Sequence, residues 1–316
     1  RSTLFPYTTL FRSGRRALLA LGNQHDDVVV LDADLSQSTK TSLFAQAFPD
    51  RFFNAGIAEQ NMIGMAAGMS TVGKVVFCSS FAMFAVGRAF EIIRNSVAYA
   101  NLNVKICATH AGLTVGEDGG SHQSVADIAV MRSLPNFTVI VPADGISAGR
   151  AVELLYATPG PAYLRLGRPA VPVIYGDSLV LRRGKGILLR TGADATIIAC
   201  GVMVAQSLQA ADRLAGRGIE VAVVDMPFIK PVDEELIIQQ AAATGALLTA
   251  EEHNIIGGLG SAVSEVCAEH LPVPISRLGI NDMFGQSGKP EELLEEYGLS
   301  VARIEEKIEE LLRRKQ

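Results

Sequence analysis

Short hydrophobic runs alternate with longer amphipathic stretches along most of the chain. Short apolar runs that end in polar loops predict buried strands, and the stretches between them predict helices. In the first half, strands are expected at 28–31, 75–78, 104–109, 137–141 and 162–166, with helices at 14–22, 85–100, 124–133 and 146–156. This alternation predicts an α/β fold with a doubly wound, mainly parallel sheet.

The alternation is interrupted once and then resumes. Prolines and glycines between residues 169 and 190 indicate a linker or a small hairpin. Beyond them, strands are expected at 195–200, 220–225 and 246–250, helices at 202–215 and 233–244, further helices starting near 257 and 290, and a last helix whose apolar face is Ile304, Ile308, Leu311 and Leu312. We therefore predict a first domain over 14–175, a linker over 176–189 and a smaller α/β C-terminal domain over 190–316.

Residues 1–13 do not fit this pattern. The segment contains Thr-Leu-Phe twice and begins and ends in an Arg-Ser pair. It has no periodicity that continues into the next helix, and it is similar to a translated sequencing-library adapter. We expect it to be a loosely ordered or artefactual leader that contributes nothing to the fold.

The composition is that of a globular protein with sizeable cores. The 316 residues suggest about two domains, with 48% hydrophobic and 19% charged residues. A net charge of −5 gives no reason to expect nucleic acid or an anionic membrane as a partner. No apolar run approaches the roughly 20 residues that span a bilayer, and no secretory signal is recognisable. The four cysteines form no Cys-x-x-Cys pair, so we expect no zinc site, no disulfide framework and a cytoplasmic location.

A glycine-rich segment follows the expected strand at 104–109. Residues 110–123 read His-Ala-Gly-Leu-Thr-Val-Gly-Glu-Asp-Gly-Gly-Ser-His-Gln. The four glycines disfavour a helix and allow the backbone to turn sharply and to approach a ligand closely. Two of the chain's five histidines lie here beside two adjacent acids, which favours a functional loop over an ordinary solvated one.

Two further segments carry candidate functional groups. Glu59 precedes a run from Met62 to Met69 that is apolar or small on every side, which predicts a buried helix. Taken alone, Glu59 fits a residue that complements the positive end of that helix somewhat better than a catalytic group. Phe81 and Phe84 lie three residues apart and are, by themselves, typical of core packing.

Three segments together resemble, in this order, the C-terminal half of transketolase, a thiamine-diphosphate enzyme. They are Gly56-Ile-Ala-Glu-Gln-Asn61, Ser80-Phe-Ala-Met-Phe84 and Gly116-Glu-Asp-Gly-Gly-Ser-His-Gln123. The resemblance covers roughly residues 14–316 and implies a pyrimidine-binding domain followed by the transketolase C-terminal domain. It also implies reversible transfer of a two-carbon ketol unit from a ketose phosphate to an aldose phosphate, as in the pentose phosphate pathway.

The resemblance assigns three residues to the cofactor. Glu59 would bond to the aminopyrimidine nitrogen and favour the imino tautomer, which removes a proton from the thiazolium carbon. Phe81 and Phe84 match the aromatic pair beside the aminopyrimidine, where a flat ring needs a flat apolar partner. Gly87 stands where the family often has a tyrosine, so one side of this pocket is expected to be more open.

The resemblance assigns five residues to the sugar substrate. His110, Asp118 and His122 match positions that bind the sugar, whose hydroxyl and carbonyl groups need donors and acceptors at fixed points. His122 would contact the carbonyl end and assist proton transfer, and His110 would contact a hydroxyl further along the sugar. Arg168 and Ser38 match phosphate-contacting positions, and an arginine suits phosphate because its planar fork donates two parallel bonds.

Two family features are missing from this sequence. The second phosphate-binding arginine would fall near Phe11, where only Arg12, Arg15 or Arg16 could substitute, so weakened binding of phosphorylated substrates is expected. The Gly-Asp-Gly motif with a later Asn, which holds the diphosphate through a divalent metal, is not found. The resemblance therefore implies a split transketolase. This chain would carry no metal ligands, and Mg²⁺ or Ca²⁺ would be bound by a separate N-terminal subunit. The two subunits would be active only together, as a dimer of heterodimers.

Several alternatives stay open. Deoxyxylulose-phosphate synthase shares Gly-Ile-Ala-Glu-Gln, the beta subunit of 2-oxo-acid dehydrogenases shares the two-domain plan, and dihydroxyacetone synthase would use the same residues on another acceptor. The segments at 80–84 and 116–123 favour transketolase over the first two. A non-catalytic structural partner is disfavoured because it would not need Glu59 or the loop's acid and histidines. Residues 251–260 fit tight packing or a dimer contact better than an anion site.

Overall fold

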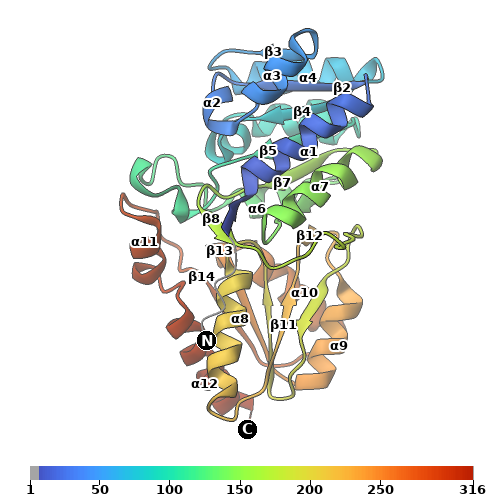
Figure 1. Ribbon diagram of the computed structural model, residues 1–316. Helices are drawn as coiled ribbons and strands as arrows, with labels where there is room; N and C mark the ends of the chain where they lie inside the picture. The colour runs from blue at the N-terminus through green and yellow to red at the C-terminus, as the bar shows by residue number, and fades with distance from the viewer. Residues whose placement is uncertain (1–6, 316) are drawn as a thin grey trace.

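The structure is a computed structural model that describes residues 7–315. Two α/β units follow one another along the chain and lie one above the other in Figure 1. The upper unit is built on a seven-stranded sheet and the lower unit on a five-stranded sheet. The predicted fold class, a doubly wound and mainly parallel α/β domain followed by a smaller α/β domain, is confirmed.

The seven-stranded sheet has the order β12-β6-β7-β5-β4-β2-β3, and every neighbouring pair except β12 and β6 is parallel. The side chains of β2, β4 and β5 are buried along their whole length, as is usual for parallel strands covered on both faces. The strands are β2 (Val28–Asp32), β3 (Phe52–Asn54), β4 (Val75–Ser79), β5 (Val104–Ala108), β6 (Thr138–Ile140), β7 (Ala162–Arg165) and β12 (Phe228–Lys230).

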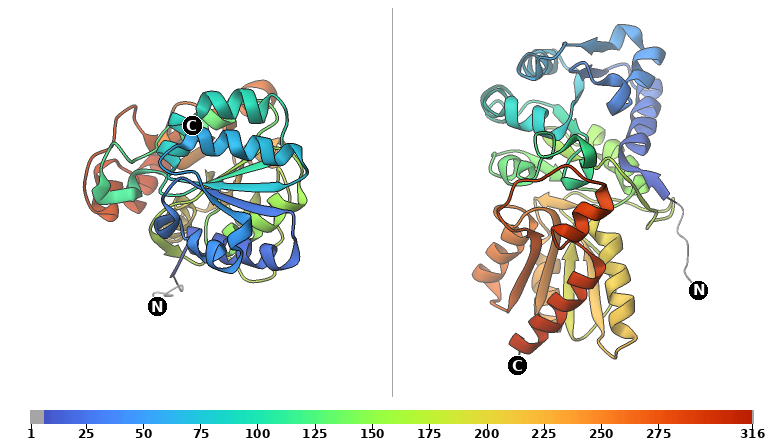
Figure 2. Two further views of the ribbon diagram at one scale, coloured as in Figure 1. Left: turned by 90° about the horizontal axis from the view of Figure 1, so that it is seen from above. Right: turned by 90° about the vertical axis from the view of Figure 1, so that its left-hand side faces the viewer.

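Helices cover both faces of this sheet, as the left view of Figure 2 shows from above. On one face α1 packs against α7, and on the other α4 packs against η2 and η3, which have π-helical geometry. The helical elements are α1 (Leu10–Gln24), α2 (Ser36–Thr39), α3 (Ser42–Ala47), η1 (Pro49–Arg51), α4 (Glu59–Thr71), η2 (Met83–Arg88), α5 (Phe90–Ile92), η3 (Ile93–Ala98), η4 (Leu113–Asp118), α6 (Asp127–Arg132) and α7 (Gly145–Ala157).

The five-stranded sheet has the order β14-β13-β10-β11-β9, with only β9 antiparallel to its neighbour. Its strands are β9 (Ile187–Arg190), β10 (Ala195–Ala199), β11 (Val221–Asp225), β13 (Leu247–Asn254) and β14 (Ile275–Ile280). Its helices are α8 (Met203–Ala215), α9 (Glu234–Thr244), α10 (Leu259–His270), α11 (Pro290–Glu296) and α12 (Val301–Lys315). In α12, Ile304, Ile308 and Leu311 are buried as the apolar face predicted.

Part of the stretch expected to be a loose leader is ordered. Strand β1 (Tyr7–Thr9) pairs antiparallel with β8 (Ala170–Pro172), and α1 starts at Leu10 rather than near Gly14. Leu10 is 1% exposed and belongs to a buried cluster of the first unit. The expected loose order therefore does not hold for residues 7–13, because strand pairing and one buried leucine anchor them. The rest of the leader lies outside the described residues.

Several strands and one helix differ from the pattern-based expectation. Strands β3, β8, β9, β12 and β14 were not expected as strands. Strand β12 lies within the C-terminal part of the chain but pairs with β6 at the edge of the first sheet. Helix α4 buries one face only, since Gly64 and Gly68 on its opposite face are exposed. Among the described residues, no helix combines the length and the hydropathy that crossing a bilayer requires.

Candidate active site

The predicted site residues follow the carboxyl ends of five neighbouring strands of the first sheet. In the spatial order of the strands, Arg168 follows β7, His110 follows β5, Phe81 follows β4, Ser38 follows β2 and Glu59 follows β3. Ligands of open α/β sheets bind at the carboxyl ends of the strands, because the loops there converge on one edge. The topology therefore brings segments far apart in sequence to one edge.

Glu59 is the first residue of α4 and is 1% exposed. The chain reaches it from β3 through a turn in which Gly56 has a left-handed φ of 74°. Arg88 Nη1, at the end of η2, donates a hydrogen bond to Glu59 Oε2 at 2.7 Å. The carboxyl group of Glu59 therefore lies at a helix N-terminus beside a guanidinium group, and the side chain of Arg88 is half exposed.

Four rings form a cluster beside this ion pair. The rings of Phe81 and Phe84 are nearly parallel at 18°, with centroids 6.1 Å apart. His110 stacks on Phe81 at 3.9 Å between centroids, and His122 meets Phe84 edge-on at 5.2 Å. Arg88 lies over Phe84, with its guanidinium carbon 5.1 Å from the ring centroid, and so joins Glu59 to the aromatic cluster.

His110 is held neutral by its surroundings. It lies two residues after the end of β5 with a left-handed φ of 55°, is 6% exposed, and its Nδ1 lies 2.9 Å from Thr109 Oγ1. Burial is the main cause that lowers the pKa of His110 to about 4, and the positive charge of Arg168 adds to the effect. A neutral imidazole can donate from one nitrogen and accept at the other, which suits contacts with sugar hydroxyls.

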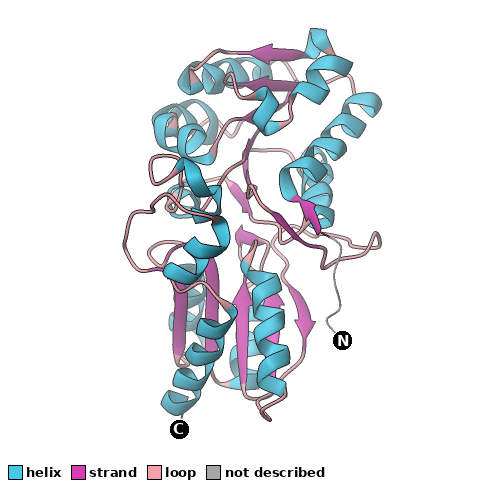
Figure 3. Cartoon of the chain, turned by 60° about the vertical axis from the view of Figure 1, so that its left-hand side comes forward, coloured by secondary structure: helices cyan, strands magenta, loops and turns pink. Residues whose placement is uncertain are grey.

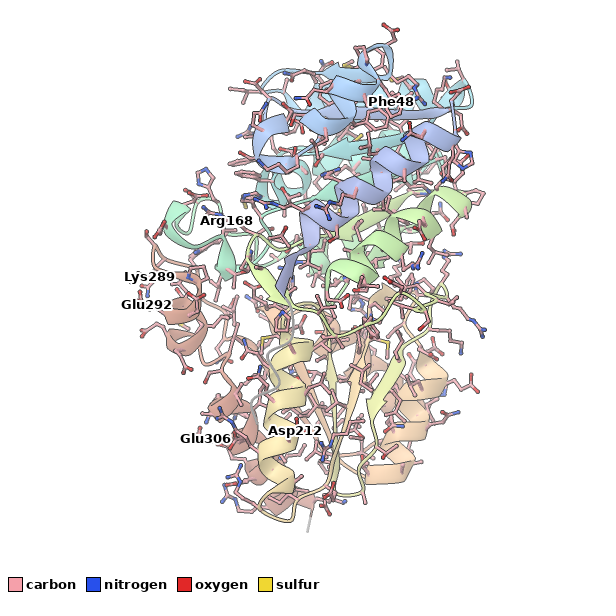
Figure 4. The ribbon with its side chains drawn as sticks, in the orientation of Figure 1. Phe48, Arg168, Asp212, Lys289, Glu292 and Glu306 are labelled. Carbon is pink, nitrogen blue, oxygen red and sulfur yellow. The ribbon has the colours of Figure 1, made fainter. Side chains whose placement is uncertain are left out.

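Asp118 and Arg168 form an ion pair at the open side of the loop. Their closest charged atoms are 3.7 Å apart, and both side chains are about two-fifths exposed. Arg168 also donates to the carbonyl of Val115, and Figure 4 shows it beside the loop. Arg168, Asp118 and His122 all lie close enough to act electrostatically on His110.

Ser38 and the arginines of α1 complete the account of the predicted residues. Ser38 is exposed on α2, at the same sheet edge, and its phosphate contact stays a prediction. Arg15 is 4% exposed and donates to the Thr39 carbonyl at 2.8 Å and to Ser79 Oγ, so it holds loops together inside the fold. Arg12 and Arg16 are exposed. Among the described residues, no three His, Cys, Asp or Glu side chains gather as a metal site.

Sequence reasoning missed Arg88, which contacts both Glu59 and Phe84. A signal was present, because Arg88 lies four residues after Phe84 in a stretch expected to be helical, and residues four apart share a helix face. However, the hydrogen-bond partner of Arg88, Glu59, lies 29 positions earlier in the sequence. Nothing in the local sequence pairs the two.

Two family descriptions match most of the chain. The transketolase pyrimidine-binding domain matches residues 10–173, and the transketolase C-terminal domain matches residues 184–304. A protein of Methanocaldococcus jannaschii described as a transketolase C-terminal section is 51% identical over 300 residues, which cover 94% of each chain. A 6-deoxy-6-sulfo-D-fructose transketolase subunit of a Clostridium species is 43% identical over 94% of this chain and 92% of its own.

A solved structure gives the same result. It is titled split gene transketolase, inactive beta4 tetramer, and it matches with a TM-score of 0.91 and 49% identity. The match covers 98% of this chain and all of that one. The two domain matches and the relatives show that this chain belongs to the transketolase family, in which it corresponds to the C-terminal half.

Proposed function

We propose that this chain is the C-terminal subunit of a two-chain, thiamine-diphosphate-dependent transketolase. It would transfer a two-carbon ketol unit reversibly from a ketose phosphate to an aldose phosphate. The observation that carries the proposal is the buried carboxyl group of Glu59 beside four aromatic rings at one sheet edge. Transferase chemistry of the transketolase family is the activity that this arrangement fits best.

The residues present fit the aminopyrimidine ring of thiamine diphosphate. Such a ring needs a carboxyl group for its ring nitrogen and a flat apolar surface for its face. Glu59 supplies the buried carboxyl group, and Phe81 and Phe84 supply the surface. When bound, thiamine diphosphate supplies the nucleophilic carbon and the electron sink of ketol transfer. Glu59 would hold the ring nitrogen and keep or release its proton.

The loop residues would bind and orient the sugar. Neutral His110 can accept or donate to a hydroxyl without a change of charge. His122, which contacts Phe84, and Asp118, which pairs with Arg168, supply further polar groups. Arg168, which pairs with Asp118 in the free chain, would turn its donors toward a terminal phosphate.

The diphosphate and its Mg²⁺ or Ca²⁺ would be held by an N-terminal partner subunit. The exposed face of α4, with Gly64 and Gly68, begins directly after Glu59 and leaves room for close approach of another chain. The similar solved protein is described as an inactive tetramer of one subunit type. By analogy, we expect this chain alone to be inactive, and active complexes to be dimers of heterodimers.

Reconstitution tests the proposal. Ketol transfer is measured for this chain, for the N-terminal subunit, and for both together, each with thiamine diphosphate and Mg²⁺. We expect turnover only when both subunits, the cofactor and the metal are present. Robust turnover by this chain alone, or none by the pair with any ketose donor, would contradict the proposal.

The anionic end of the donor sugar is a separate question. One relative is named for a sulfonated sugar, 6-deoxy-6-sulfo-D-fructose, rather than a phosphorylated one. Arg168 can bind either anion, because phosphate and sulfonate groups both offer two neighbouring oxygens to the guanidinium group. Comparison of kcat/KM for phosphorylated, sulfonated and neutral ketoses shows which anionic group the enzyme prefers. We expect the neutral ketose to have the lowest kcat/KM.

A further inference from the structure

The glycines of the loop at 110–123 lie against the C-terminal domain. A Cβ on Gly112, which has a left-handed φ of 85°, would lie 2.3 Å from the carboxyl carbon of Glu252. A Cβ on Gly120 would lie 2.5 Å from the carbonyl oxygen of Gly285. The sequence led us to expect that these glycines let a ligand approach the backbone. At Gly112 and Gly120 it is the second unit of the same chain that approaches the backbone instead.

The first anchor is Glu252 on β13. It is 3% exposed, and its Oε1 accepts a hydrogen bond from the backbone N–H of Thr114 at 2.6 Å. Burial raises the pKa of Glu252, while Arg165 and the hydrogen bond from Thr114 oppose that shift. A carboxyl group buried at this position fixes the first half of the loop, because the backbone that it binds, at Thr114, lies six residues after the end of β5.

The second anchor is the segment 284–289, which precedes α11 and which we call the support segment. Gln123, the last residue of the loop, donates from Nε2 to the carbonyl of Gln286 at 2.9 Å and to the carbonyl of Leu113 at 3.1 Å. Ser287 Oγ donates to the carbonyl of Glu117 at 2.7 Å. The middle and the end of the loop are therefore tied to the support segment, while Glu252 ties its first half to the same unit.

The views agree on this arrangement. In Figures 1 and 3 the loop containing η4 lies directly beside α11 at the junction of the two units. Figure 4 labels Arg168 on one side of the junction and Lys289 and Glu292, at the start of α11, on the other. Helix α11 and η4 are in contact.

We propose that the C-terminal domain acts as a positioning element for the sugar-binding loop, through Glu252 and the support segment. A fourteen-residue loop with four glycines loses much conformational entropy when it is ordered. Contacts from a separate, well-packed unit offset that loss and keep His110, Asp118 and His122 in their relative places. The attachment of the loop to Glu252 and the support segment is argued from the observed contacts alone. Its effect on sugar binding rests on the proposed function.

Gly285→Ala is the test variant, and Gly176→Ala is its matched control. Neither glycine has a left-handed φ, so alanine is tolerated by the backbone at both positions. At Gly285 the new methyl group would lie 1.7 Å from Gln123 Oε1, whereas at Gly176 nothing lies within 4 Å. Hydrogen exchange of peptides from residues 110–123 is measured by mass spectrometry on the purified chain.

We expect exchange in the loop to become about tenfold faster in Gly285→Ala and to stay unchanged in Gly176→Ala. Ser287→Ala removes one hydrogen bond at an exposed edge and cannot unfold the chain. It should accelerate exchange about twofold to tenfold around Glu117. Wild-type exchange rates in both Gly285→Ala and Ser287→Ala would overturn the anchoring.

Kinetics on the reconstituted enzyme test the link to substrate. We expect Gly285→Ala to raise KM for the ketose donor several-fold while the apparent affinity for thiamine diphosphate stays that of the wild type. Faster loop exchange with an unchanged KM would refute the effect on sugar binding. If the wild-type pair shows no ketol transfer at all, the proposed function fails, while the exchange result still decides the anchoring.

Discussion

Replacement of Glu59 by glutamine is the sharpest test of the proposed chemistry. Glutamine has nearly the same size and keeps one oxygen that can accept from Arg88, but it cannot exchange a proton with a bound ring. The buried surroundings of Glu59 are otherwise unchanged. We therefore expect Glu59→Gln to fold and to pair with the N-terminal subunit, yet to lose most of its turnover.

The two effects differ in size enough to be separated. The partner of Glu59, Arg88, has a side chain that is 49% exposed, so water stabilises its charge when the carboxylate is removed. Loss of this ion pair should cost about 1 kcal/mol or less of unfolding free energy, which corresponds to a fall of about 2–4 °C in Tm at most. General acid–base groups contribute about 10²–10⁴-fold to rates, and we expect kcat to fall by that factor.

The assay compares kcat, Tm and subunit pairing for wild type, Glu59→Gln and Glu91→Gln. Glu91 is an exposed acid on α5 that bonds to Asn95, so its substitution removes the same charge away from the site. We expect the control to keep wild-type turnover. A Glu59→Gln enzyme with more than about a tenth of the wild-type kcat would refute the assigned role, because an essential proton carrier contributes more than that.

Three further predictions concern Arg168, His110 and Leu10. Arg168→Gln should raise KM for a phosphorylated ketose about tenfold or more and leave KM for a neutral ketose nearly unchanged, since only the former offers an anion to the guanidinium; equal effects on the two substrates would argue against a phosphate contact. Because burial lowers the pKa of His110 to about 4 from a usual value near 6.5, the unfolded chain binds a proton that the folded chain does not, so stability from this group is present above about pH 6.5 and is lost as pH falls toward 4. Urea unfolding at pH 7 and pH 5 should therefore show a smaller loss of stability in His110→Gln than in wild type, and parallel losses would count against a buried neutral imidazole. Leu10→Ala should lower the free energy of unfolding by about 2–5 kcal/mol, because the side chain is 1% exposed, whereas a loose leader would give no change in denaturant midpoint.

Sequence reasoning predicted the parts of the fold that depend on local periodicity. Buried strands such as β2, β4 and β5 and amphipathic α12 have strong patterns of their own, and the structure confirms them. Strand β12 has three residues, too few for a pattern to emerge. The ordered position of Leu10 depends on the pairing of the preceding strand β1 with β8, which lies about 160 residues away in the sequence. No local pattern can reveal such a pairing.

The candidate site could be predicted in its residue types but only partly in its surroundings. Glu59, Phe81, His110 and Arg168 were identified from motifs, and parallel-sheet topology explains why they converge. Their catalytic and binding roles stay predictions. The contact of Arg88 with Glu59 and the docking of the loop glycines on the second unit join segments far apart in sequence. Such contacts are set by packing between elements, so they appear only in three dimensions.

The central claim is that a buried carboxyl group in this chain serves a thiamine ring whose diphosphate is held by a second chain. A crystal structure of the reconstituted pair with thiamine diphosphate and Mg²⁺ tests it most directly. We predict a Glu59 carboxyl oxygen about 2.6–3.2 Å from the aminopyrimidine ring nitrogen, with the metal bound by the partner. An aminopyrimidine ring beyond hydrogen-bonding reach of Glu59, or a diphosphate bound by this chain, would contradict the account.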